Sequence, residues 1–144
     1  MAFFADLTPY TYWEPYDTSG RWRPDEPWPS LPLLNVGWLD CSHPFQTGAP
    51  PDELIPALTK LAKVRVRQTR GHHHCELCLR DMGDAAREAI QQGLIPRGSA
   101  EFQVRGHGVV YAAPQLLTHY VAAHAYLPPL VFCEAAIRVA ELSR

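Results

Sequence analysis

Two cysteines separated by two residues, Cys75 and Cys78, carry the clearest chemical pattern in this 144-residue chain. This spacing lets both thiolates face one metal ion from a tight turn, and zinc favours thiolate and imidazole donors arranged as a tetrahedron. Two more ligands are then needed, and the chain offers His119 and His124 about 40 residues downstream. Four residues between two histidines lies within the range used by sites of two cysteines and two histidines. The sequence therefore predicts one bound Zn²⁺ held by these four side chains.

The histidine spacing conflicts with ideal helix geometry. Five positions along an α-helix rotate two side chains by roughly 140° relative to each other. We therefore expect the helix that carries His119 and His124 to tighten or end between them, or only one of the two to bind the ion. His72, His74 and His107 remain alternative ligands.

A second cysteine and histidine pair, Cys41 and His43, lies upstream. In an extended segment both side chains would point the same way, so a second metal site stays open as an alternative. We favour a purely structural role for this pair. Cys133 falls on the apolar stripe of the last expected helix, and we expect it to be buried.

Two other kinds of chemistry compete with a structural metal. A strand, a Cys-x-x-Cys pair and a helix also form the setting of thioredoxin-like redox motifs, although the usual Trp-Cys-Gly-Pro-Cys is absent here. A zinc hydrolase would need only three protein ligands, for instance Cys75, Cys78 and one histidine, with water in the fourth position. Glu76 or His74 would then act as the base. The number of protein ligands separates these hypotheses.

Composition limits the class of protein. The net charge is −2, which gives no general attraction for nucleic acid, and no apolar run reaches the roughly 20 residues that span a bilayer. The N-terminus has neither the basic flank nor the apolar stretch of a secretory signal. Four cysteines without such a signal indicate a reducing compartment, so we expect a cytoplasmic protein.

The expected elements form an α+β fold with a small antiparallel sheet and three to four helices. Residues 1–32 are rich in proline and aromatic residues and are expected to form an extended arm that packs on the body. Residues 33–144 are expected to form a single α+β zinc-binding domain. Strands are expected at 33–40, 64–69, 101–105 and 109–112, and helices from about 51, 84, 114 and 129.

Two strings give the chain a resemblance. Arg70-Gly-x-His-His-Cys-Glu-Leu-Cys and Tyr111-Ala-Ala-Pro-x-Leu-Leu-x-His-Tyr-Val-x-x-His-x-Tyr-x-Pro-Pro resemble an uncharacterised family of small bacterial proteins. Asn35-Val-Gly-Trp-Leu-Asp and His43-Pro-Phe extend the similarity, which covers most of the chain from about residue 33. The resemblance implies no activity, but it groups Cys75, Cys78, His119 and His124 and leaves Cys41 outside.

These patterns favour a small non-catalytic protein in which zinc ties the loop after the expected strand at 64–69 to the penultimate helix. The remaining surface, together with the aromatic arm, is expected to contact another protein in an interaction or regulatory role. The sequence leaves the partner, the pathway and the oligomeric state open.

Overall fold

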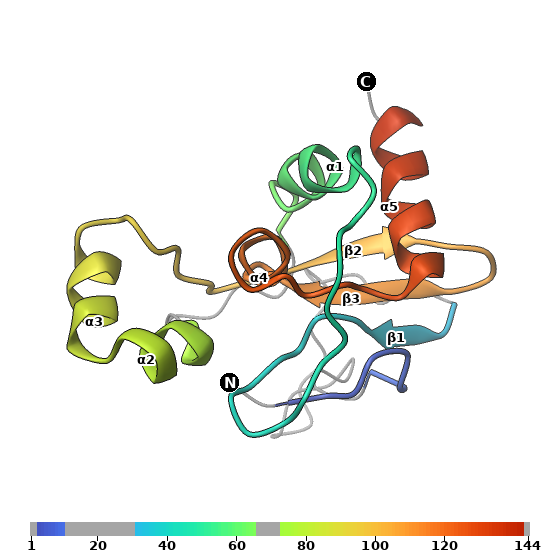
Figure 1. Cartoon of the computed structure of the whole chain (residues 1–144). Helices are drawn as coiled ribbons and strands as arrows, with labels where there is room; N and C mark the ends of the chain where they lie inside the picture. Colours follow the sequence, from blue (N-terminus) through green and yellow to red (C-terminus); the bar gives the residue numbers. More distant parts are fainter. Residues whose placement is uncertain (1–2, 11–30, 66–72, 143–144) are drawn as a thin grey trace, which may run out of the picture.

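The computed structural model describes residues 3–10, 31–65 and 73–142. Within these ranges the chain forms a three-stranded sheet and five helices, which confirms the predicted α+β class (Figure 1). The strands are β1 (Leu33–Asn35), β2 (Glu101–Arg105) and β3 (Val110–Pro114). The helices are α1 (Leu54–Leu61), α2 (Glu76–Met82), α3 (Asp84–Gln91), α4 (Leu117–His124) and α5 (Leu130–Leu142). None of the described helices is long and apolar enough to cross a membrane.

The sheet has the order β1-β3-β2 and is mixed rather than purely antiparallel. β2 and β3 form the expected antiparallel hairpin around Gly106-His107-Gly108, whereas β1 pairs with β3 in parallel, with Leu33 opposite Val110. A long connection that contains three helices separates β1 from β3. So long a connection allows β1 to pair with β3 in either a parallel or an antiparallel direction. The residue pattern of β1 does not indicate which of the two occurs.

The central strand β3 is buried on both faces, and its side chains alternate between two clusters. Tyr111 and Ala113 join the main core, which also contains side chains of α1, α4 and α5. Val110 and Ala112 face the opposite way and pack with Tyr10, Leu33 and Trp38. This part of the molecule therefore has three layers, with α1 and α5 above the sheet and the N-terminal segment below it (Figure 1).

The first strand is shorter than the expected span of 33–40 because the backbone turns at Gly37, where φ is +81°. A side chain here would be strained, and its Cβ would lie 2.3 Å from Leu117 Cδ1. The expected strand at 64–69 is not present at Val64 and Arg65, and its remainder lies outside the described residues. α2 is an additional helix that the sequence patterns did not predict.

Residues 3–10 lie against β1 and the segment that follows it. Phe4 pairs with Trp38 and Pro9 with Leu34 in isolated bridges. The hydroxyl of Tyr10 donates to the buried carboxylate of Glu101 at 2.7 Å. Residues 11–30, which hold three of the four tryptophans, lie outside the described residues, so the expected boundary of the arm at residue 32 stays a prediction.

Asp6 connects this N-terminal segment to the far end of α4. Its carboxylate accepts a hydrogen bond from the Gly37 amide at 3.0 Å and another from the Tyr126 hydroxyl at 2.7 Å. Burial raises the pKa of Asp6 above its usual range, while both hydrogen bonds oppose that shift. A partly buried carboxylate thus joins three segments that are distant in sequence.

We expect Asp6→Asn to gain stability relative to the wild type as the pH rises from about 4 to about 7. The folded-state pKa of Asp6 is raised, so its favourable contribution is complete below the unfolded-state pKa and is lost as the pH rises through the folded-state value. Asparagine stays neutral over that range. Urea unfolding of both proteins at several pH values measures the difference, with the exposed Asp52→Asn as control. A difference that is constant with pH would contradict the prediction.

Candidate metal centre

The N-terminal turn of α2 presents both cysteines of the Cys-x-x-Cys pair. Cys75 is the N-cap residue, with extended backbone angles, and its sulfur accepts a hydrogen bond from the Cys78 amide at 3.4 Å. A helix N-terminus, whose amide groups can donate to sulfur, suits a thiolate. Between the cysteines Leu77 is fully buried in the main core, which fixes the orientation of this turn.

The segment before Cys75 is held by a second connection. His73 and Gly98 exchange two backbone hydrogen bonds in an isolated antiparallel bridge. This bridge joins the two ends of residues 73–98. We call this segment, which contains α2 and α3 and extends to the left in Figure 1, the excursion. The position of Cys75 thus follows both from its helix and from this bridge.

Helix α4 carries both histidines and is α-helical from Leu117 to His124, so it neither tightens nor ends between them. The helix ends directly after His124. The amide of Ala125 donates to the Tyr120 carbonyl, five residues earlier, and the amide of Tyr126 donates to the same carbonyl at 3.1 Å. These bonds reach further back than the four-residue step of an α-helix and close α4 at its C-terminus.

The end of α4 is fixed from outside the helix. Ala125, just after His124, has left-handed backbone angles, with φ at 55°. Its carbonyl accepts a hydrogen bond from the Gly48 amide at 3.0 Å, and the amide of Leu127 donates to the Gln46 carbonyl at 2.9 Å. Gly48 and Gln46 hold the end of the helix in place but supply no ligand atom. In the sequence, Gly48 indicates only a turn.

The structure brings together all four predicted ligands. One donor atom from each of Cys75, Cys78, His119 and His124 can be chosen so that all four lie within 4.8 Å of one another. Cys78 Sγ lies 3.3 Å from Nε2 of both histidines, and Cys75 Sγ lies 3.3 Å from His124 Nε2. A tetrahedral ion with the usual zinc bond lengths needs edges of roughly 3.3–3.8 Å. The donors are therefore close to the size that a four-coordinate ion requires.

In the metal-free cluster, burial favours the uncharged forms of Cys75, His119 and His124. Burial raises the pKa of Cys75 to about 12, and burial also lowers the pKa of His119 and of His124. The imidazoles are thus kept in the neutral form that can bind a metal, whereas thiol protons must leave when an ion binds. The set of two sulfurs and two nitrogens contains no carboxylate and fits a borderline-soft ion such as zinc.

The other candidate residues lie elsewhere. His74 is exposed and faces a separate cavity, and His107 lies in the β2–β3 turn, 2.9 Å from an Arg138 nitrogen. His72 lies outside the described residues. Cys133 is fully buried, as expected.

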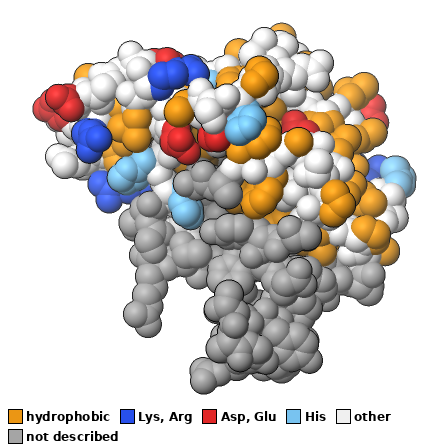
Figure 2. Space-filling model, turned by 90° about the horizontal axis from the view of Figure 1, so that it is seen from below, with side chains coloured by type: hydrophobic (Ala, Val, Ile, Leu, Met, Phe, Trp, Pro, Cys, Tyr) orange, Lys and Arg blue, Asp and Glu red, His pale blue; other side chains and the backbone are white. Residues whose placement is uncertain are grey.

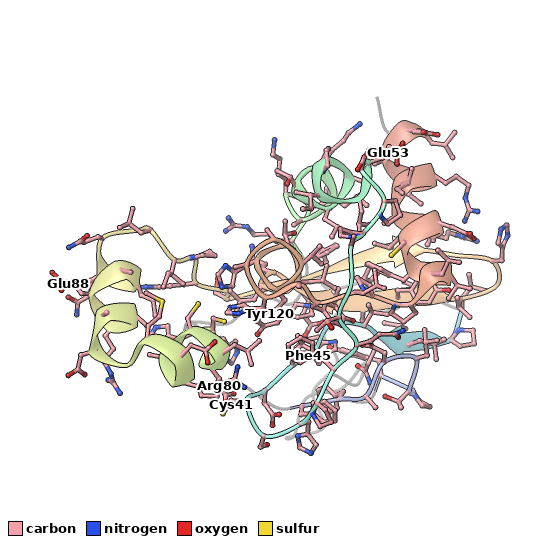
Figure 3. The ribbon with its side chains drawn as sticks, viewed as in Figure 1. Cys41, Phe45, Glu53, Arg80, Glu88 and Tyr120 are labelled. Carbon is pink, nitrogen blue, oxygen red and sulfur yellow. The ribbon has the colours of Figure 1, made fainter. Side chains whose placement is uncertain are left out.

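Cys41 and His43 do not converge on a metal site in the part of the chain that the structure describes. His43 stacks on Phe3 and pairs with Asp40 at 2.8 Å. The thiol of Cys41 is exposed, donates to a Glu76 carboxylate oxygen at 3.6 Å and lies beside Arg80 (Figure 3). This contact also shows that the carboxylate of Glu76 is directed at Cys41.

Comparison with known proteins gives a match to one protein family. No curated protein matches the sequence, and no solved structure does. Residues 2–137 match a family described as a domain of unknown function, DUF7919, and this span contains all four clustered side chains. The expected resemblance to an uncharacterised family is thereby confirmed, and the chain belongs to the DUF7919 family.

Proposed function

We propose that the protein is a small, non-catalytic zinc-binding module in which the metal has a structural role. One observation carries the proposal: four soft donor atoms from two helices already lie within 4.8 Å of one another. Sites with four protein ligands are typically structural, because no coordination position remains for water or substrate. The ion would join α2, at the start of its excursion, to the end of α4.

The same geometry argues against a zinc hydrolase. That hypothesis needs one open position and a base beside the ion. A cavity of about 400 Å³ does include His119 in its lining, but it includes neither cysteine. Glu76 contacts Cys41, and His74 lines another cavity. Neither candidate base therefore belongs to the cluster, which supports the structural role.

We further propose a cytoplasmic location and a protein partner. Two thiolate ligands are most durable in a reducing compartment, and all four cysteines are free. At the start of α5 the large apolar side chains of Leu130 and Val131 are exposed, at 66% and 52% of their surface. Such neighbouring apolar side chains support contact with another protein.

Elemental analysis and cobalt substitution test the proposal directly. We expect about one zinc ion per chain in the purified protein, as one tetrahedral site requires. Replacement by Co²⁺ should give the intense visible bands of a tetrahedral ion and a thiolate charge-transfer band in the near ultraviolet. Absence of stoichiometric zinc would refute the central claim, and an oxygen donor in place of one protein ligand, detected by X-ray absorption spectroscopy, would restore the hydrolase hypothesis.

Alkylation with iodoacetamide separates the structural site from the redox alternative. We expect rapid labelling of the exposed Cys41 alone in the metal-loaded protein, since metal binding protects Cys75 and Cys78 and Cys133 is buried. Addition of a chelator should make Cys75 and Cys78 reactive, as mass spectrometry of the labelled peptides would show. Immediate labelling of that pair before chelation would favour a thiol redox protein.

A further inference from the structure

A cavity of about 320 Å³ lies beside helices α2 and α3, outside the four-residue cluster. Its size falls at the lower end of the range of small-molecule sites. Figure 2 shows basic and histidine side chains together with apolar atoms on this side of the molecule. The lining residues are Leu79, Ile90, His74, Arg87, Gln91 and Arg97.

Three segments supply the polar wall of this cavity. Arg87 and Gln91 are one helical turn apart on α3, so they share a face. His74 directly follows His73, and Arg97 directly precedes Gly98, the two partners of the backbone bridge. That bridge therefore brings an imidazole and a guanidinium to the same cavity as the face of α3.

Within the described ranges, the two guanidinium groups have no counter-charge in the cavity, because none of the described lining residues is acidic. Neither Arg87 nor Arg97 makes an ion pair or a side-chain hydrogen bond with any residue in the described ranges. By contrast, Arg80 on the neighbouring helix is paired with Asp81 at 2.8 Å. The cavity thus holds two unneutralised cations whose donors are available to a ligand.

The remaining wall is apolar. Ile90 is only 4% exposed and belongs to the main core, and Leu79 packs against that core. An inorganic ion alone would leave this surface without a partner, whereas a ligand with an apolar body would cover it. The lining therefore combines a cationic side with an apolar floor.

We propose that this cavity binds a small phosphate monoester that carries an apolar group. A guanidinium can donate two parallel hydrogen bonds to phosphate, and two guanidinium groups match the double negative charge of a monoester. The ring N–H of His74 and the amide of Gln91 supply further donors. The family description assigns no ligand, and the proposal does not depend on the identity of the metal.

Phenyl phosphate is a suitable probe, because it joins a dianion to an apolar ring. We expect a titration of the metal-loaded full chain, followed by ¹H–¹⁵N NMR, to shift the amide signals of Arg87, Gln91 and Arg97 in a saturable way. Arg87→Gln and Arg97→Gln should each raise the dissociation constant by roughly tenfold or more, because each removes one charge-assisted contact. Arg105→Gln, on an exposed arginine at the end of β2, is the matched control and should leave binding unchanged.

The unperturbed signals of the sheet show whether each variant stays folded, and zinc content is measured on the same samples. Absence of saturable shifts up to about 10 mM probe, or equal binding by wild type and both cavity variants, would overturn the proposal. Benzoate bound as tightly as phenyl phosphate would overturn the choice of phosphate. Inorganic phosphate bound as tightly would overturn the role of the apolar floor.

Discussion

Cys78→Ser is expected to abolish stoichiometric zinc binding and to lower the free energy of unfolding by about 3–5 kcal/mol. Cys78 is the donor that lies 3.3 Å from both histidines, so its loss removes the contact common to both imidazoles. Serine conserves the shape of the side chain but supplies a poor zinc ligand at neutral pH. Elemental analysis after gel filtration and urea unfolding of the same samples measure the two effects.

Two other cysteines serve as matched controls for that substitution. Cys41→Ser changes an exposed thiol outside the cluster and should leave both zinc content and stability unchanged. Cys133→Ala removes a fully buried sulfur and should cost about 1 kcal/mol through the cavity it leaves, with zinc retained. Zinc retained by Cys78→Ser, or lost equally from Cys41→Ser, would disprove the assignment of this residue as a ligand.

Metal removal is expected to loosen one part of the molecule far more than the rest. Without the ion, the described contacts that hold the excursion carrying α2 and α3 are the His73–Gly98 bridge, the Cys41–Glu76 hydrogen bond and the packing of side chains such as Leu77 and Ile90. Hydrogen exchange followed by mass spectrometry should show at least a roughly 100-fold faster exchange for residues 73–98 and for the end of α4. The hairpin of β2 and β3, with α1 and α5, should remain protected because most residues of the main core lie outside residues 73–98.

The metal-free Cys78→Ser protein should give the same exchange pattern, which separates loss of the ion from a direct effect of the chelator. A uniform rise in exchange over the whole chain would mean that the ion stabilises the entire fold rather than only the contact between α2 and the end of α4. Unchanged exchange would mean that the helices meet equally well without a metal, and a structural role would then be refuted.

The four clustered residues were predictable because ligand chemistry restricts both residue type and spacing. The helix that carries the histidines runs through both of them rather than tightening or ending between them, and the alternative that only one of them binds the ion stays a prediction. The end of this helix depends on a left-handed Ala125 and on the contact of its carbonyl with Gly48. No glycine marks that position, and a contact between residues 48 and 125 leaves no local pattern.

The sheet was predictable only in part for a similar reason. Alternating side chains identified the hairpin partners β2 and β3, whose pairing is local. The direction of β1 depends on its partner, and the short α2 begins at a cysteine whose sulfur replaces the usual capping oxygen. The cavity with Arg87 and Arg97 could not be found from spacing, since a backbone bridge between residues 73 and 98 creates it.

The parallel pairing of β1 with β3 bears on how the chain folds during its synthesis. The ribosome releases residues 33–35 long before their partners at 110–112, and residues 4 and 9 in turn pair with positions 38 and 34. Contacts this distant in sequence slow folding, because a long loop must close before they form. The N-terminal layer therefore completes its contacts only after the central strand has emerged, and a nascent chain holds Cys75 and Cys78 without their histidine partners until α4 follows.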